Sequence, residues 1–292
     1  MTDKKPILQV RNLSVDFQIP TGGMFGGKKI LKAVKEVSFD LHQGETLGIV
    51  GESGCGKSTL SRAAIRLIEP TSGESLWMGK DIIKMSPREI IALRKDIQMI
   101  FQDPLASLDP RMTAGAIIAE PLLIHYPEVS KKERAARVIA MMAKVGLAPE
   151  LVNRYPHEFS GGQCQRIGIA RALITNPKLV VCDEAVSALD VSVQAQVINL
   201  LMDLQKELGI SLLFIAHDIA VVRHIAQRVM VLYFGEVVEI GESEQVVTDP
   251  QHDYTKKLIA SVPVPDPKAE MARRELRRKL RREAAEEAKA TA

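Results

Sequence analysis

The sequence of 292 residues has only three cysteines and no long apolar run, and both absences exclude classes of protein. The cysteines are odd in number and lack the spacing of a zinc site, which indicates a reducing compartment rather than a disulfide framework. The longest apolar stretches, such as 179–182 and 212–216, span a few residues, whereas a membrane-spanning helix needs about 20. The opening MTDKKPILQV has no apolar signal region. We therefore expect a cytoplasmic protein that does not cross a bilayer.

The basic charge of the chain is concentrated near its C-terminal end. Residues 268–292 contain nine Lys or Arg and five Glu, a net charge of +4, so residues 1–267 carry −1 of the overall +3. A nucleic-acid-binding protein normally carries its basic excess on the folded domain. We therefore expect no nucleic acid partner. The tail 268–292 has Leu276 and Leu280 at helical spacing; it reads as a charged helix or disordered segment, or as a contact for anionic lipid headgroups.

Strand and helix patterns alternate along most of the chain, which predicts an α/β fold with a mainly parallel sheet. The glycine-rich stretch 20–27 reads as a loop, and residues 113–151 have helical periodicity only, which predicts a helical insertion. Expected strands are 7–10, 13–17, 33–39, 45–50, 97–101, 179–182, 211–216 and 229–234, and expected helices are 58–68, 191–208 and 219–226.

Residues 51–59 read GESGCGKST and match the phosphate-binding pattern GxxxxGK[ST], here called the P-loop. The P-loop follows an apolar run and opens a helix, so its backbone N–H groups and the helix N-terminus can surround a phosphate. Lys57 is predicted to reach the β- and γ-phosphates, and Ser58 to coordinate Mg²⁺. The candidate nucleotide-binding residues of the P-loop are Gly51, Ser53, Gly54, Cys55, Gly56, Lys57, Ser58 and Thr59.

A second motif is formed by the apolar run 179–182, which leads directly to Asp183 and Glu184. A buried strand that ends in two adjacent acids suits a Walker B segment, in which Asp183 holds Mg²⁺ and Glu184 polarises the attacking water. Two solvated acids at a strand end are the ordinary alternative. The P-loop upstream favours the functional interpretation, and the two motifs together predict a nucleoside triphosphatase.

The surroundings of the cysteines predict different reactivities. Cys55 lies within the P-loop beside Lys57 and near a helix N-terminus, so we expect a lowered thiol pKa and high reactivity. Cys182 is expected to be buried in the strand before Asp183, and Cys164 follows the glycine-rich motif described next.

Residues 159–163 read FSGGQ and precede a helical pattern, which predicts a second anion-facing helix N-terminus. One triphosphate does not need two such sites in one chain, so a second copy is expected to supply this one in trans. The motif resembles the signature of ABC ATPases, usually LSGGQ, with Phe159 at the first position. The resemblance implies that Ser160, Gly161, Gly162 and Gln163 contact the ATP held by a partner subunit.

Further motifs follow in the order of the ABC ATPase family and cover nearly the whole chain. The resemblance implies that Gln102 links Mg²⁺ to the helical subdomain and that Asp190 lies at the dimer interface. It also implies that His217 contacts the γ-phosphate and the attacking water, although alone His217 would read as structural. Phe17 resembles the aromatic residue that stacks on adenine, with an apolar core role as the alternative. Ala185 departs from the family, which usually has proline there.

Within the family, the chain is most similar to the peptide and nickel importer branch, and above all to the second ATPase subunit of bacterial oligopeptide importers. The implied function is ATP-driven import of oligopeptides or dipeptides, with nickel, glutathione or a sugar as alternative substrates. The implied ligands are ATP and Mg²⁺. The stretches that carry this likeness are 101–111, 155–160, 164–168, 250–255 and 262–265.

The resemblance also implies an assembly at the cytoplasmic face of the inner (plasma) membrane. Its partners are a second ABC ATPase subunit, identical or a sister chain, two transmembrane permease subunits and, indirectly, an extracytoplasmic substrate-binding protein. The implied domain is an ABC ATPase over residues 1–267, with an antiparallel β subdomain and a helical subdomain at about 103–175, followed by the tail 268–292. A non-transport ABC ATPase acting on nucleic acid or ribosomes is disfavoured by the single P-loop, and a non-hydrolysing regulator by the presence of Glu184 and His217.

Overall fold

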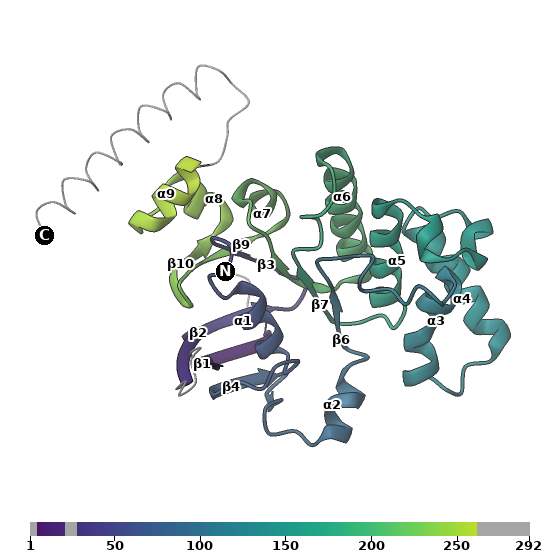
Figure 1. The fold of residues 1–292 in the computed structure, drawn as a ribbon, viewed down its shortest axis with the longest axis horizontal. Helices are drawn as coiled ribbons and strands as arrows, with labels where there is room; N and C mark the ends of the chain where they lie inside the picture. The colour runs from purple at the N-terminus through teal and green to yellow at the C-terminus, as the bar shows by residue number, and fades with distance from the viewer. Residues whose placement is uncertain (1–4, 21–27, 262–292) are drawn as a thin grey trace, which may run out of the picture.

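The computed structural model describes residues 5–20 and 28–261, and its central element is a six-stranded sheet (Figure 1). The strand order is β10-β9-β3-β8-β7-β6. Neighbouring strands are parallel except β9 and β10, which are antiparallel. This arrangement confirms the predicted α/β fold with a mainly parallel sheet. The strands are Thr46–Val50 (β3), Ile97–Ile100 (β6), Leu179–Asp183 (β7), Ser211–Ile215 (β8), Arg228–Tyr233 (β9) and Glu236–Glu242 (β10).

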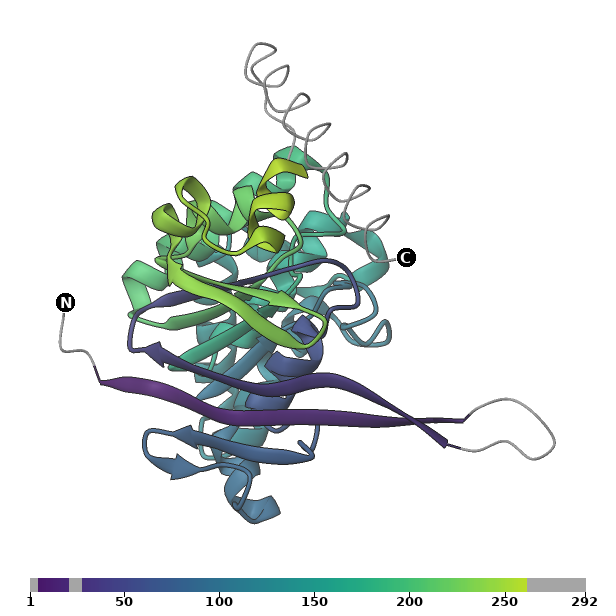
Figure 2. The same ribbon diagram turned by 90° about the vertical axis from the view of Figure 1, so that its left-hand side faces the viewer.

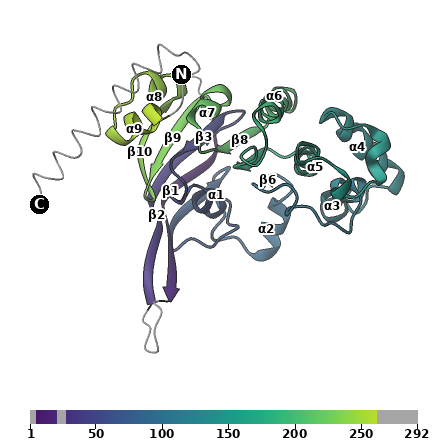
Figure 3. The ribbon, with the colours of Figure 1, turned by 45° about the horizontal axis from the view of Figure 1, so that its top comes forward.

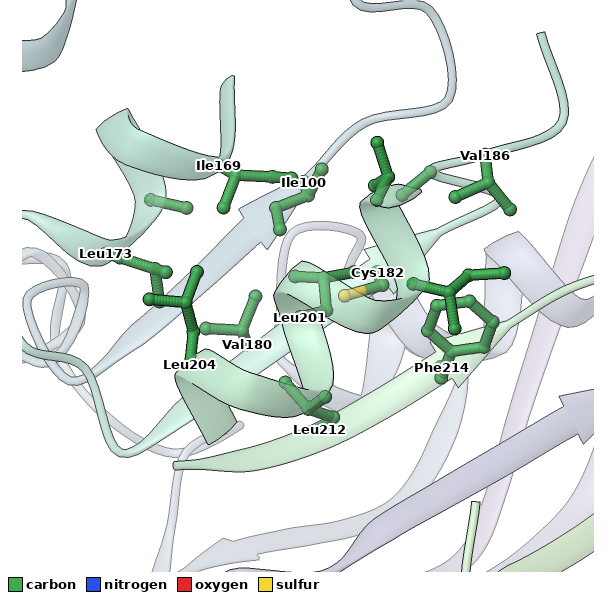
Figure 4. Packing of buried hydrophobic residues seen from close by; sticks show 14 of the residues in the cluster. Ile100, Ile169, Leu173, Val180, Cys182, Val186, Leu201, Leu204, Leu212 and Phe214 are labelled. Atoms are coloured by element: carbon green, nitrogen blue, oxygen red, sulfur yellow. The ribbon is translucent and has the colours of Figure 1, made fainter. Parts of the chain in front are cut away.

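The central strands are buried on both faces, as their continuous apolar sequences require. Every residue of β3, β7 and β8 is buried. One face packs against α5 (Gly161–Leu173) and α6 (Val191–Leu208), and Figure 4 shows this layer. The sheet residues of that layer include Val180, Cys182, Leu212 and Phe214. The opposite face packs against α1 (Lys57–Ala64) and a second sheet.

The second sheet is antiparallel and has the order β2-β1-β4-β5, which confirms the predicted antiparallel β part. The segments 7–10 and 13–17, expected as two short strands, belong to one long strand. The backbone has a positive φ of +49° at Asn12, but the chain stays paired in the sheet on both sides of it. Figure 2 shows the β1–β2 pair projecting from the body of the molecule. The predicted loop 20–27 lies almost wholly outside the described residues. The strands are Pro6–Pro20 (β1), Lys28–His42 (β2), Ser72–Trp77 (β4) and Lys80–Asp81 (β5).

The segment between β6 and β7 is helical, as predicted from its periodicity. It contains α3 (Ala114–His125) and α4 (Lys131–Lys144), and it leads through short 3₁₀ turns to α5. The side chains of Thr113 and Ser130 cap α3 and α4 by accepting a backbone N–H from the first turn. Figure 3 shows α3 and α4 on the far side of the molecule from β1 and β2.

The remaining helices are short and include one that differs from its prediction. Helix α1 ends at Ala64 rather than at residue 68, because Arg66 adopts a left-handed conformation with φ of +53° and turns the chain toward β4. In the part of the chain that the structure describes, no helix combines the length and apolar character needed to span a bilayer. The other helices are Pro87–Leu93 (α2), Ile219–Ile225 (α7), Ser243–Thr248 (α8) and Asp253–Ser261 (α9).

Candidate functional site

The P-loop connects the end of β3 to the start of α1, and its glycines are required by its shape. Gly54 and Gly56 have φ of +81° and +105°, values that favour glycine. At Gly56 a β-carbon would also lie 2.3 Å from the carbonyl oxygen of Ala33 on β2. The backbone therefore turns tightly beneath β2 and opens α1 without a capping side chain, which leaves the first N–H groups of the helix for a ligand.

Lys57 is buried and directed back along the P-loop. Its Nζ donates hydrogen bonds to the carbonyl oxygens of Gly51 and Glu52, both at 2.9 Å. The same Nζ lies 3.8 Å from Oε1 of Glu184. The ammonium group is thus held inside the loop, next to the carboxylate predicted to polarise water.

Asp183 is fully buried at the end of β7, and both of its carboxylate oxygens are occupied. Ser58 Oγ donates to Oδ1 at 2.6 Å. Arg62, on the next turn of α1, donates to Oδ2 from Nη2 at 2.9 Å and from Nε at 3.2 Å. The structure therefore brings together Ser58 and Asp183, the two residues of the P-loop and β7 for which Mg²⁺ binding is predicted, and adds a guanidinium that the sequence motifs did not single out.

Glu184 follows Asp183 directly but leaves the strand. Its φ is +49°, an unusual conformation for a residue other than glycine, and its N–H donates to the carbonyl oxygen of Ile215 at 3.1 Å. Its Oε2 accepts a hydrogen bond of 2.9 Å from Nε2 of Gln102. This bond connects the predicted water-polarising carboxylate to the segment that leads into α3.

The P-loop forms one wall of a cavity of about 630 Å³, here called the P-loop cavity. Phe17 is 38% exposed on its wall, so the alternative that Phe17 is a core residue is wrong. Gly51 and Asp183 are buried and do not line this cavity. The predicted site residues on the wall are Phe17, Ser53, Gly54, Cys55, Gly56, Lys57, Ser58, Thr59, Gln102 and Glu184, and the residues that sequence reasoning missed are Ile30, Leu31, Lys32, Ala33, Lys35, Phe234 and Gly235.

The missed residues come from β2 and from the turn between β9 and β10. Gly235 accepts a hydrogen bond from the N–H of Lys35 at 2.8 Å and donates one to the carbonyl oxygen of Cys55 at 2.9 Å. The turn therefore joins β2 to the P-loop. In the sequence, Gly235 after Phe234 is the sign of a turn at this point, and both residues have positive φ in the structure. The sequence pattern does not indicate which distant segment the turn contacts.

Three predicted groups lie outside the P-loop cavity of their own chain. The motif 160–163 opens α5, where Ser160 Oγ accepts from the N–H of Gln163 and its own N–H donates to the Gln163 side chain. Asp190 caps α6 by accepting from the N–H of Val193 at 3.0 Å. His217 is exposed after β8. Figure 1 shows α5 separated from α1 by strands of the central sheet.

The predicted activation of Cys55 is wrong. Its side chain is buried, and this burial raises the pKa of the thiol, although the charge of Lys57 partly opposes the shift. Burial raises the pKa of Cys182, in β7, to about 12. Proximity to a lysine and a helix N-terminus thus does not outweigh burial in the P-loop.

Comparison with known proteins agrees with this geometry. The family model for the ABC transporter matches residues 34–187, and a second model, the C-terminal region of oligopeptide/dipeptide transporters, matches residues 238–289. The second match crosses the predicted domain boundary at 267. That boundary and the predicted tail remain predictions.

The curated relatives include ATP-binding subunits of transporters. The oligopeptide transport ATP-binding protein OppF of Haemophilus influenzae is 61% identical over 92% of this chain and 81% of its own length. OppF of Escherichia coli is 59% identical over 91% and 80%. The glutathione import ATP-binding protein GsiA of Escherichia coli is 54% identical over 94% of this chain, which spans 44% of that protein.

A solved structure has the same fold. The dimeric ATP-binding cassette MJ0796, in a post-hydrolysis state bound to ADP and Pi, is 31% identical with a TM-score of 0.73, over 81% of this chain and 98% of that one. These matches confirm the resemblance on which the site residues were assigned. The chain belongs to the ABC transporter family and is an ATP-binding ATPase subunit of that family.

Proposed function

We propose that the chain powers the import of oligopeptides or dipeptides, by ATP-driven closing and opening of a dimer that acts on membrane permease subunits. The OppF relatives and the C-terminal transporter region support this substrate class. Glutathione is the second candidate, because GsiA is 54% identical over most of the chain. The observation that supports the proposal is that the P-loop lines a cavity, whereas the motif 160–163 opens α5 outside the lining of that cavity.

The first half is the P-loop cavity. ATP entering it would meet the N–H groups at the start of α1, and Lys57 Nζ would exchange the carbonyl oxygens of Gly51 and Glu52 for the β- and γ-phosphates. Phe17 stands on the wall where an adenine ring could stack. Glu184, held by Gln102, would orient the attacking water and accept its proton.

The residues near Asp183 suit Mg²⁺. Ser58 Oγ and Asp183 Oδ1 are 2.6 Å apart, and Ser58 and Gln102 line the same cavity, so these residues offer hydroxyl, carboxylate and amide oxygens. Such hard oxygen donors are the ligands that Mg²⁺ prefers. When bound, the ion would offset the negative charge of the phosphates. Arg62 would keep Asp183 Oδ2 engaged and leave Oδ1, which here accepts from Ser58, for the ion.

The second half is the motif 160–163. It opens α5 and does not line its own P-loop cavity, so we assign it to a nucleotide held by another subunit. Ser160, Gly161, Gly162 and Gln163 would then contact that nucleotide, with Asp190 at the interface and His217 near the γ-phosphate. Loss of the γ-phosphate would release both halves, which makes ATP hydrolysis a switch between closed and open dimers.

A groove near Gln102 is our candidate contact surface for the permease subunits. A groove of about 300 Å³ lies between α1, β6 and α3 and is lined by half-exposed apolar side chains, among them Leu67, Phe101 and Ile124. Glu120 and Arg171 contribute charged groups to the same lining. A permease loop bound there, at the cytoplasmic face of the membrane, would be displaced when the Gln102 segment moves. The extracytoplasmic binding protein would act through the permeases.

Glu184→Gln tests the split site. The variant keeps Lys57, Ser58 and Asp183, so we expect it to bind MgATP, to hydrolyse it at least about 100-fold more slowly and to elute as a dimer in gel filtration only when MgATP is present. Glu207→Gln, on the exposed side of α6, is the matched control and should behave as the wild type. A monomeric Glu184→Gln variant in MgATP would contradict the proposal. Uptake of labelled oligopeptide and of labelled glutathione is compared between cells with and without the chain. The substrate whose uptake falls in the cells that lack the chain is the one that the transporter imports.

A further inference from the structure

The motif 250–255, which carries part of the family likeness, has no role in the site described above. In the structure it is anchored to β10. The carboxylate of Glu239 accepts hydrogen bonds from the N–H groups of Gln251, at 2.9 Å, and His252, at 3.0 Å. The ring Nδ1 of His252 accepts from the N–H of Tyr254 at 3.1 Å. These bonds fix where α9 begins and direct the Tyr254 side chain inward.

The Tyr254 side chain reaches the P-loop. It is only 8% exposed, and its hydroxyl oxygen accepts a hydrogen bond of 3.0 Å from the N–H of Glu52. Its ring lies 4.1 Å from the ring of Tyr233, and the Tyr233 ring lies 4.6 Å from that of Phe234. Phe234 in turn lines the P-loop cavity. One residue of α9 thus contacts the nucleotide site by a hydrogen bond and through a row of aromatic rings.

Glu52 is the residue where this contact matters. Its carbonyl oxygen holds Lys57 Nζ at 2.9 Å, while its N–H is held by Tyr254. Both polar groups of one peptide position are therefore occupied, one by the site lysine and the other by the C-terminal segment. The bond from the Glu52 N–H to Tyr254 does not involve Lys57, so it can hold the loop backbone when Lys57 turns to the phosphates. A backbone that is already held loses less entropy when a ligand binds, and this raises affinity.

We propose that Tyr254 is a positioning residue that preorganises the P-loop for ATP and couples nucleotide binding to α9. The inference rests on the proposed role of the P-loop cavity as the ATP site. Its consequence is reciprocal: whatever displaces α9 weakens ATP binding, and ATP binding stabilises α9 by the same free energy. Helix α9 is then a control element of the ATPase.

Tyr254→Phe tests this coupling, because it removes the hydroxyl and retains the ring. We expect the full-length variant to bind a non-hydrolysable ATP analogue about three- to tenfold more weakly, the range for loss of one hydrogen bond. The KM for ATP should rise by a similar factor while kcat stays within about twofold. Tyr233→Phe is the matched control, since that hydroxyl has no hydrogen bond within the described residues and its ring lies in the same stack.

Hydrogen–deuterium exchange supplies a readout that a merely structural tyrosine would not move. In the wild type, the analogue should slow amide exchange in residues 253–261, and in Tyr254→Phe this effect should disappear while it persists in Tyr233→Phe. Equal affinities of the two variants, or no effect of the analogue on 253–261 in the wild type, would overturn the inference and leave the proposed function standing. A wild-type chain that does not bind the analogue would overturn both.

Discussion

Replacing Arg62 by Met should destabilise the nucleotide-free protein, because the guanidinium neutralises a carboxylate that water cannot reach. The Asp183 side chain is 1% exposed, whereas that of Arg62 is 40% exposed. Removal of one partner from a fully buried ion pair costs about 3–5 kcal/mol, and an exposed pair contributes at most about 1 kcal/mol. The buried carboxylate and the half-exposed guanidinium place the expected loss between these values, at about 2–3 kcal/mol.

The assay is urea denaturation without nucleotide, which gives the free energy of unfolding of each variant. A double-mutant cycle with Asp183→Asn isolates the ionic contribution. In the Asp183→Asn background the side chain at 183 is neutral, so Arg62→Met should cost less than about 1 kcal/mol. Met keeps much of the apolar stem of Arg, so lost packing should be small.

Equal losses from Arg62→Met in both backgrounds would refute this reasoning, because the charge of Asp183 would then be irrelevant. Arg62→Lys provides a second check. Lysine keeps the positive charge but cannot reproduce the two hydrogen bonds of 2.9 and 3.2 Å that the guanidinium forms. We expect its stability to lie between those of the wild type and Arg62→Met.

Two further predictions concern the P-loop thiol and the packing of the central sheet. Because burial raises the pKa of Cys55, maleimide labelling at Cys55 should be slower than for an exposed thiol at pH 7.5 and should accelerate with pH into the alkaline range. Mass spectrometry of the labelled peptide measures the labelling rate. A rate that is high and constant from pH 6 to 8 would contradict this prediction. MgATP should slow the labelling of Cys55 further by covering the cavity wall. Gly48→Ala should destabilise the protein by about 1–3 kcal/mol, since a β-carbon there would lie 2.0 Å from a methyl group of Val222 on α7. At Gly168 in α5, an added β-carbon would meet no atom within 4 Å apart from the local backbone of its own helix. Gly168→Ala should therefore be neutral or stabilise by up to about 1 kcal/mol, and thermal unfolding of both variants decides the comparison.

Local pattern predicted the elements whose ends carry their own signals. Helix 191–208 was predicted at its observed limits, because Asp190 caps its start and Gly209, with φ of +65°, ends it. The helix predicted at 58–68 is longer than the observed α1, which ends at Ala64, because the apolar periodicity continues past the point where Arg66 turns the backbone. Periodicity reports which face of a helix is apolar, and it does not report where a neighbouring strand forces the chain to turn.

The family, the P-loop and the paired acids can be predicted from the sequence, because each depends on residue types at short spacings along the chain. Which distant residues complete the site depends on how the chain packs in three dimensions. Arg62 on Asp183, the turn at Phe234 against the P-loop and Tyr254 on Glu52 are contacts between segments far apart in sequence. The pKa of Cys55 belongs to the same class, since burial by the surrounding segments outweighs the charge of its neighbour Lys57. Solvent exclusion is a property of the packed molecule, and a local motif does not encode it.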